Sequence, residues 1–163
     1  MKWIKINAGG VATIHFRVRG YKPHKRPDLD EWCVVDLVVE SDIINYALRD
    51  DEALEIQELE RVEEKLDLTL KGEGDDCSVV DPMEPYMIFE FHPRYEKKIF
   101  PNMFWKIILW SDDGAPSEST INLALYEEEM KLLSLYLKYA SGRLKEDSPE
   151  IDELIQQGLI YGD

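Results

Sequence analysis

The longest helical pattern in the sequence runs from Asp50 to Lys71. Its apolar residues recur at steps of three or four, which is the period of one face of an α-helix. They are Ile56, Leu59, Val62, Leu66 and Leu70. Asp50 or Asp51 is expected to cap the start of this helix, and Gly72 is expected to end it. The segment Asp42–Arg49 is interpreted as the connection that leads into it.

Several segments alternate apolar and polar residues with a period of two, as half-buried β-strands do. These segments are residues 11–19, 32–41, 87–91 and 120–125. A further segment, residues 103–111, is apolar on both faces, which is expected of a central or helix-covered strand. A short strand is also expected at Trp3–Ile6. The alternation places Cys33 on an apolar face, so it is interpreted as a core cysteine.

A second helix is predicted over Glu127–Ser141, where apolar residues form two neighbouring stripes instead of the single stripe that a surface helix needs. The second stripe consists of Leu132, Tyr136 and Tyr139. The tail, residues 145–163, is a candidate to cover it, because Ser148 followed by Pro149 is typical of a helix start. A dimer contact through the two tyrosines is the competing explanation.

The order of these elements favours the α+β class. Most strands are joined by connections of hairpin length, which argues for an antiparallel sheet. We therefore expect a single antiparallel sheet with the two main helices packed on one face and a short C-terminal helix. No repeat or long linker divides residues 1–163, so they are expected to form one domain.

The 163 residues carry a net charge of −15, and this charge is distributed unevenly. Residues 1–27 contain seven lysines and arginines and no acid. Such an excess of negative charge disfavours binding to nucleic acid or to anionic membranes and favours encounter with a cationic protein. No apolar run reaches the ~18 residues of a membrane span, and the N-terminus has no apolar signal-peptide core. A cytoplasmic protein with reduced cysteines is expected.

Acidic residues collect on the predicted helix in an arrangement that stability alone would not select. Glu60, Glu64 and Asp67 share one face, with Glu63 close by. Glu60 and Glu64 are a like-charge pair at i,i+4, and the second half of a helix favours cations. This face is therefore either a surface for a basic partner or simply a solvated face.

No catalytic motif is present in the sequence, so neither an enzyme nor a cofactor is expected. Cys33 and Cys77 match no zinc or redox spacing, and the three histidines are scattered, so no metal site is expected. With 34 acidic residues, a paired-carboxylate site stays open as an alternative, although no spacing supports it.

Four pieces of the sequence, in order, resemble the WapI-like immunity proteins. They are WCVVDLVVES, ELERVEEKLDLTLKGE, MEPYMIFEF and INLALYEEEMKLLSLYL, which lie between Glu31 and Gly142. The most specific part is Glu84-Pro85 leading into an aromatic strand. Residues 1–27 depart from the family pattern and are interpreted as a variable elaboration. The resemblance implies a bacterial protein that blocks a toxin domain by binding, without turnover.

Together these observations predict an immunity protein that binds and neutralises a cationic toxin domain, such as a nuclease. It is expected to be a monomer or a weak homodimer. The candidate contact residues are Glu58, Glu60, Glu64 and Asp67, with Glu84 as a weaker candidate because it is held between two prolines and equally suits a turn. The alternative is an acidic adaptor or assembly subunit with no toxin partner.

Overall fold

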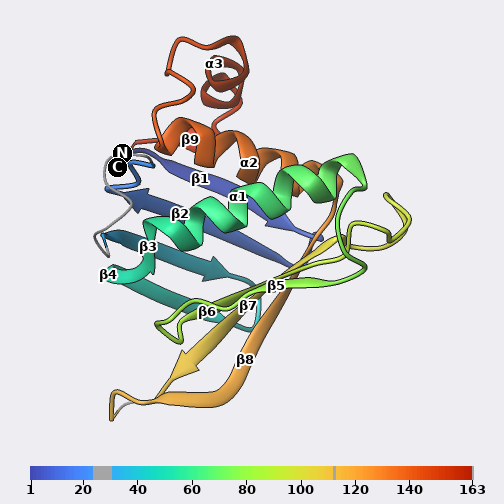
Figure 1. Cartoon of the computed structure of the whole chain (residues 1–163). Helices are drawn as coiled ribbons and strands as arrows, with labels where there is room; N and C mark the ends of the chain where they lie inside the picture. Colours follow the sequence, from blue (N-terminus) through green and yellow to red (C-terminus); the bar gives the residue numbers. More distant parts are fainter. Residues whose placement is uncertain (24–30, 112, 163) are drawn as a thin grey trace.

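The computed structural model describes residues 1–23, 31–111 and 113–162, and its strands form two antiparallel sheets (Figure 1). The first sheet has the strand order β4-β3-β2-β1-β9, and the second has the order β5-β6-β7-β8. The strands of the first sheet are β1 (Trp3–Ala8), β2 (Ala12–Arg19), β3 (Trp32–Glu40), β4 (Asn45–Glu55) and β9 (Ile160–Tyr161). Those of the second are β5 (Ser78–Val80), β6 (Met87–Phe91), β7 (Met103–Trp110) and β8 (Pro116–Leu125).

Three helices complete the described fold, and the α+β class is confirmed. They are α1 (Ile56–Lys71), α2 (Glu127–Ala140) and α3 (Pro149–Gln156). Figure 1 shows α1 and α2 side by side across one face of the first sheet, with α3 beyond α2. The expectation of one sheet is wrong, because α1 separates β4 from β5 and carries the chain into a second layer.

The two sheets and the helices share one buried core, and Trp105 of β7 lies where the sheets meet. Its ring centroid is 5.1 Å from that of Phe16 in the first sheet and 5.2 Å from that of Phe89 in β6. Phe16 also packs against Tyr136 of α2, with ring centroids 6.0 Å apart, so it lies on the helix-covered face of the first sheet. The contact of Trp105 with Phe16 joins the two layers.

The predicted start of the first helix is wrong, since residues 45–55 form β4 and α1 begins at Ile56. The acidic run that resembled a helix cap is a strand with an irregular register opposite β3, in which Asp50 has a positive φ of 51°. The Glu58 carboxylate accepts a hydrogen bond from the Glu55 backbone N–H at 2.8 Å, which satisfies one free donor of the helix start. Gly72 ends the helix in the left-handed conformation, as predicted.

The tail begins its helix at Ser148 and Pro149, as predicted, but it does more than cover α2. Residues Ile160–Tyr161 form β9, which pairs with β1 and brings the two ends of the chain together (Figure 1). The prediction that the tail covers Tyr136 is wrong. This side chain is fully buried against the first sheet, where its hydroxyl donates to the Lys2 carbonyl at 2.9 Å. It is therefore not available for a dimer contact.

The face of the first sheet that no described helix covers carries a buried carboxylate, Asp36, at 1% exposure. It accepts hydrogen bonds from Arg17 Nε at 2.8 Å, Arg19 Nη2 at 3.0 Å and the Asp50 backbone N–H at 2.9 Å. Burial raises the pKa of the Asp36 carboxyl, but the Asp50 N–H and the two guanidinium groups outweigh burial and lower the pKa overall. The ionised form is thus favoured in the folded chain.

Replacing Asp36 with asparagine is expected to lower the free energy of unfolding by about 2–3 kcal/mol at neutral pH, allowing for the partial exposure of Arg19. Because the folded pKa is depressed, the ionised carboxylate stabilises the fold above its unfolded pKa of about 3.9, and this contribution is lost as pH falls below that value. Urea unfolding at several pH values should show the gap between wild type and Asp36→Asn closing on acidification. A gap independent of pH would contradict this.

Candidate functional site

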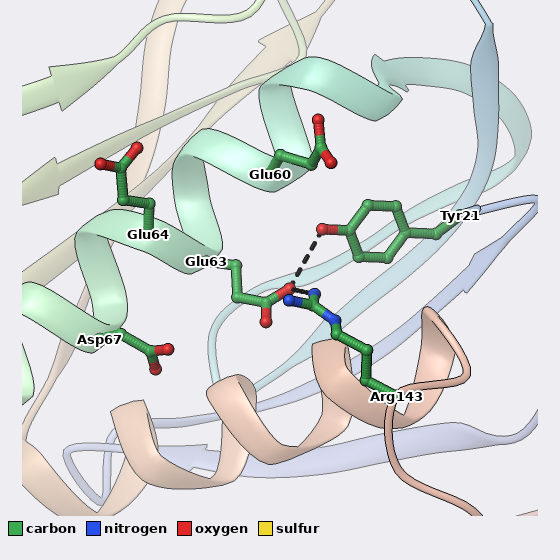
Figure 2. A pocket seen from close by; sticks show the side chains of 6 residues that line it. All are labelled: Tyr21, Glu60, Glu63, Glu64, Asp67 and Arg143. Atoms are coloured by element: carbon green, nitrogen blue, oxygen red, sulfur yellow. Dashed lines mark hydrogen bonds and ion pairs between the residues drawn. The ribbon is translucent and has the colours of Figure 1, made fainter. Parts of the chain in front are cut away.

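A groove of ≈ 170 Å³ lies between α1 and the turn that follows α2. Figure 2 shows the six side chains around it, of which four are carboxylates on α1. The lining residues are Tyr21, Glu60, Glu63, Glu64, Asp67 and Arg143. Arg143 is the single cation of this lining. The groove is therefore a concentration of negative charge on one side of a helix.

The base of the groove is Glu63, whose side chain is only 4% exposed. Its Oε2 atom accepts a hydrogen bond from the Tyr21 hydroxyl at 3.1 Å and forms an ion pair with Arg143 Nη2 (Figure 2). Its Oε1 atom is buried without a hydrogen-bond partner among the described residues. Burial, followed by the charge of Glu63, raises the pKa of Tyr21, so the phenol stays a neutral donor.

Asp67 lines one end of the groove and links α1 to α2 by hydrogen bonds. Its Oδ1 atom accepts hydrogen bonds from Ser134 Oγ and from Lys138 Nζ, each at 2.9 Å. The like-charge pair of Glu63 and Asp67 at i,i+4 is therefore compensated by cations from outside α1, Arg143 and Lys138. These two acids act in the packing of α1 as well as lining the groove.

Glu60 and Glu64 lie at the rim of the groove and are more accessible. Glu60 is partly exposed, and Glu64 is exposed, with no ion pair or hydrogen bond from its side chain to another residue in the described ranges. The helical period thus correctly placed Glu60, Glu64 and Asp67 on one patch. Of the three, Glu64 is the carboxylate most open to a partner.

The structure does not bring the other two candidate residues to this patch. Glu58 is buried at 5% exposure, where its carboxylate also accepts a hydrogen bond from the Met83 backbone N–H at 2.7 Å. Glu84 follows Met83 in the connection between β5 and β6 and does not line the groove. Glu58 therefore fixes the start of α1 and the turn beside it, and we leave both residues out of the contact surface.

Two residues of the groove, Tyr21 and Arg143, were missed by the sequence analysis. Both stand outside the predicted helix, and no motif or periodicity links them to Glu63. Arg143 lies two residues after Ser141, where the predicted second helix ends, and this position alone gives no sign of a buried partner. Such pairs arise from tertiary packing and carry no local signal in the sequence.

The chain was compared with family models, curated proteins and solved structures. No family model, no curated protein and no solved structure matches the chain. The resemblance to the WapI-like immunity proteins thus rests on the four sequence pieces that suggested it. Of the helices in the described part of the chain, none has both the length and the apolar character that crossing a bilayer requires.

A second cavity, of ≈ 320 Å³, lies on the face of the first sheet opposite the helices. There the ring of Trp3 is flanked by the guanidinium groups of Arg17 at 4.5 Å and Arg49 at 5.0 Å, a cation–π arrangement. In its lining the negative charge of Glu40 is offset by the positive charge of Arg49, so this cavity does not complement a cationic partner.

Lys25 and Arg26 of the basic N-terminal region lie outside the described residues.

The described residues include one group of side chains that could hold a metal ion, and it lies away from the groove. It consists of Cys77, Glu90 and His92, at the edge of the second sheet. The sequence analysis did not group these residues, because Cys77 precedes β5 while Glu90 and His92 lie at the end of β6, and their spacing along the chain matches no zinc motif.

Proposed function

We propose that this chain is an immunity protein that binds and neutralises a cationic toxin domain, such as a nuclease, by holding a basic side chain of that domain in the acidic groove. The observation that carries the proposal is the lining of the groove, where four carboxylates face a single cation. The net charge of −15 would steer a basic partner toward the chain from a distance. Such a protein would act in the cytoplasm, where the toxin threatens its producer.

The size of the groove favours a protein side chain over a small molecule. Pockets for drug-sized ligands typically enclose about 300–1,000 Å³, whereas this groove encloses ≈ 170 Å³. Arg143 already places a guanidinium group against Glu63 at the base of the groove (Figure 2). The same lining can accept a lysine or arginine of a partner at Glu60 and Glu64, whose carboxylates lie at the rim.

A nuclease supplies the chemistry that this surface would recognise. The groove of a nuclease must be cationic to hold phosphates, so a row of carboxylates can compete for the same cations. An adaptor whose charge serves only solubility would have no such partner. An immunity protein would bind one specific basic domain, at a rate that depends on charge attraction, whereas such an adaptor would not.

The partner to test is the C-terminal domain of a large secreted protein, if one is encoded by the gene directly upstream. Association with that domain is expected to slow at least tenfold as salt rises from about 0.1 M to about 1 M. The Debye length falls over this range from about 10 Å to about 3 Å and screens the attraction. Stopped-flow or surface-based kinetics would measure the rate. An upstream gene of another kind, or no binding, would favour the adaptor.

A further inference from the structure

The edge of the second sheet places three chemically different side chains together. Ser78 of β5 pairs with Phe91 of β6, so Cys77, one position earlier, lies beside His92. Glu90 projects from the same face of β6 as His92, because the residue between them, Phe91, points into the core. The thiol sulfur, a carboxylate oxygen and an imidazole nitrogen all lie within 4.8 Å of one another.

Two of these side chains are already oriented by their neighbours. The His92 ring stacks on Tyr95 with centroids 4.4 Å apart, and the edge of Phe104 packs against it at 5.7 Å. Its Nε2 atom is 2.6 Å from Glu90 Oε1. Lys106 Nζ donates to the other carboxylate oxygen, Glu90 Oε2, at 2.9 Å. Metal-binding sites commonly hold their ligands in this way, with neighbouring groups fixing the ring and the carboxylate.

We propose that Cys77, Glu90 and His92 bind one zinc ion, a site separate from the acidic groove. A thiolate and an imidazole together favour zinc over magnesium or calcium, which prefer oxygen ligands. Tetrahedral zinc bonds of about 2.0–2.3 Å place ligand atoms roughly 3.5 Å apart, so small side-chain adjustments bring the three atoms to this spacing. The thiolate and the carboxylate balance the charge of the ion.

The geometry leaves the fourth position of a tetrahedral zinc ion to water. Cys77 is exposed, so the ion can enter from solvent without opening the core. The buried side of the site is formed by His92, which is 8% exposed. This inference replaces the sequence-based expectation of no metal. That expectation considered spacing along the chain, whereas the ligands here meet where the start of β5 pairs with the end of β6.

Titration of the reduced, metal-free full-length chain with zinc alone tests the site. Calorimetry or competition with a chromophoric chelator is expected to show one equivalent bound. Cys77→Ser and His92→Gln are each expected to weaken binding at least tenfold, since losing even a supporting neighbour of a ligand typically costs about 10–100-fold. With cobalt in place of zinc, the sulfur-to-metal charge-transfer absorption should appear in the wild type and be absent from Cys77→Ser.

Two controls separate this site from other thiols and acids. Cys33→Ala removes the buried thiol of the first sheet, and Glu96→Gln removes a carboxylate from the loop between β6 and β7. Both variants should bind zinc as the wild type does. Absence of saturable binding, or a Cys77→Ser variant that binds zinc with unchanged affinity, would overturn the proposal and leave Glu90, His92 and Lys106 as an ion-pair network only.

Discussion

Replacing Trp105 with alanine is expected to destabilise the fold by about 3–5 kcal/mol, the usual cost of truncating a buried aromatic residue. Trp105 is 0% exposed, and its ring contacts Phe16 in the first sheet and Phe89 in the second. Removing it leaves a cavity where the two layers meet. Urea unfolding followed by circular dichroism would measure the change.

Trp110, on the same strand, provides the matched control. It is partly exposed, stacks on Tyr86 with centroids 4.6 Å apart, and donates from its indole N–H to the Pro85 carbonyl at 3.1 Å. Trp110→Ala should cost only about 1–2 kcal/mol, for one hydrogen bond and one aromatic contact. If the two variants were equally stable, Trp105 would not be the residue that joins the sheets.

The periodicity of the sequence predicted most elements of this fold because their periods are local properties. The alternation in residues 11–19 and 32–41 became β2 and β3, and the stripe of Glu127–Ser141 became α2. β9 was missed, since two residues are too few to show a period. Alternation also does not say which strand is the neighbour of which, and so it did not predict the division into two sheets.

The start of α1 shows why a helix boundary predicted from local composition is wrong where burial in a sheet favours a strand. Asp50, Asp51 and Glu52 have the composition of a helix cap, but they belong to β4, whose register opposite β3 shifts on either side of the Val35–Asp51 pair. Ala53 and Leu54, which follow them, are fully buried there. Packing against the rest of the sheet therefore outweighs the local preference, and the helix begins one turn or more later than composition suggests.

The groove was predictable in part. Glu60, Glu64 and Asp67 lie on one patch because helical geometry places them there whatever the rest of the chain does. The cations that pair with acids of the groove, Arg143 with Glu63 and Lys138 with Asp67, lie far along the sequence, and nothing in the sequence assigned them. The sequence thus identified the acidic helix face, and the structure adds which of its acids are already paired.

Charge reversal at the rim has the largest effect expected on binding. The double variant Glu60→Lys with Glu64→Lys turns two attractive contacts repulsive, so binding to a cationic domain should weaken by about 2 kcal/mol or more, roughly 30-fold. Both positions are accessible, so the free energy of unfolding of the free chain should change by no more than about 1 kcal/mol. Urea unfolding would confirm that the variant is folded.

The most direct test of the central claim compares this double variant with a second one, Glu150→Lys with Glu153→Lys. Both residues of the second pair are exposed on α3, and its reversal changes net charge by the same amount without touching the groove. Dissociation constants for the candidate partner, a C-terminal domain encoded by the upstream gene, should rise about 30-fold or more for the groove variant and by less than about threefold for the α3 variant. Equal weakening by the two variants, or no weakening by the groove variant, would show that the acidic groove is not the binding site.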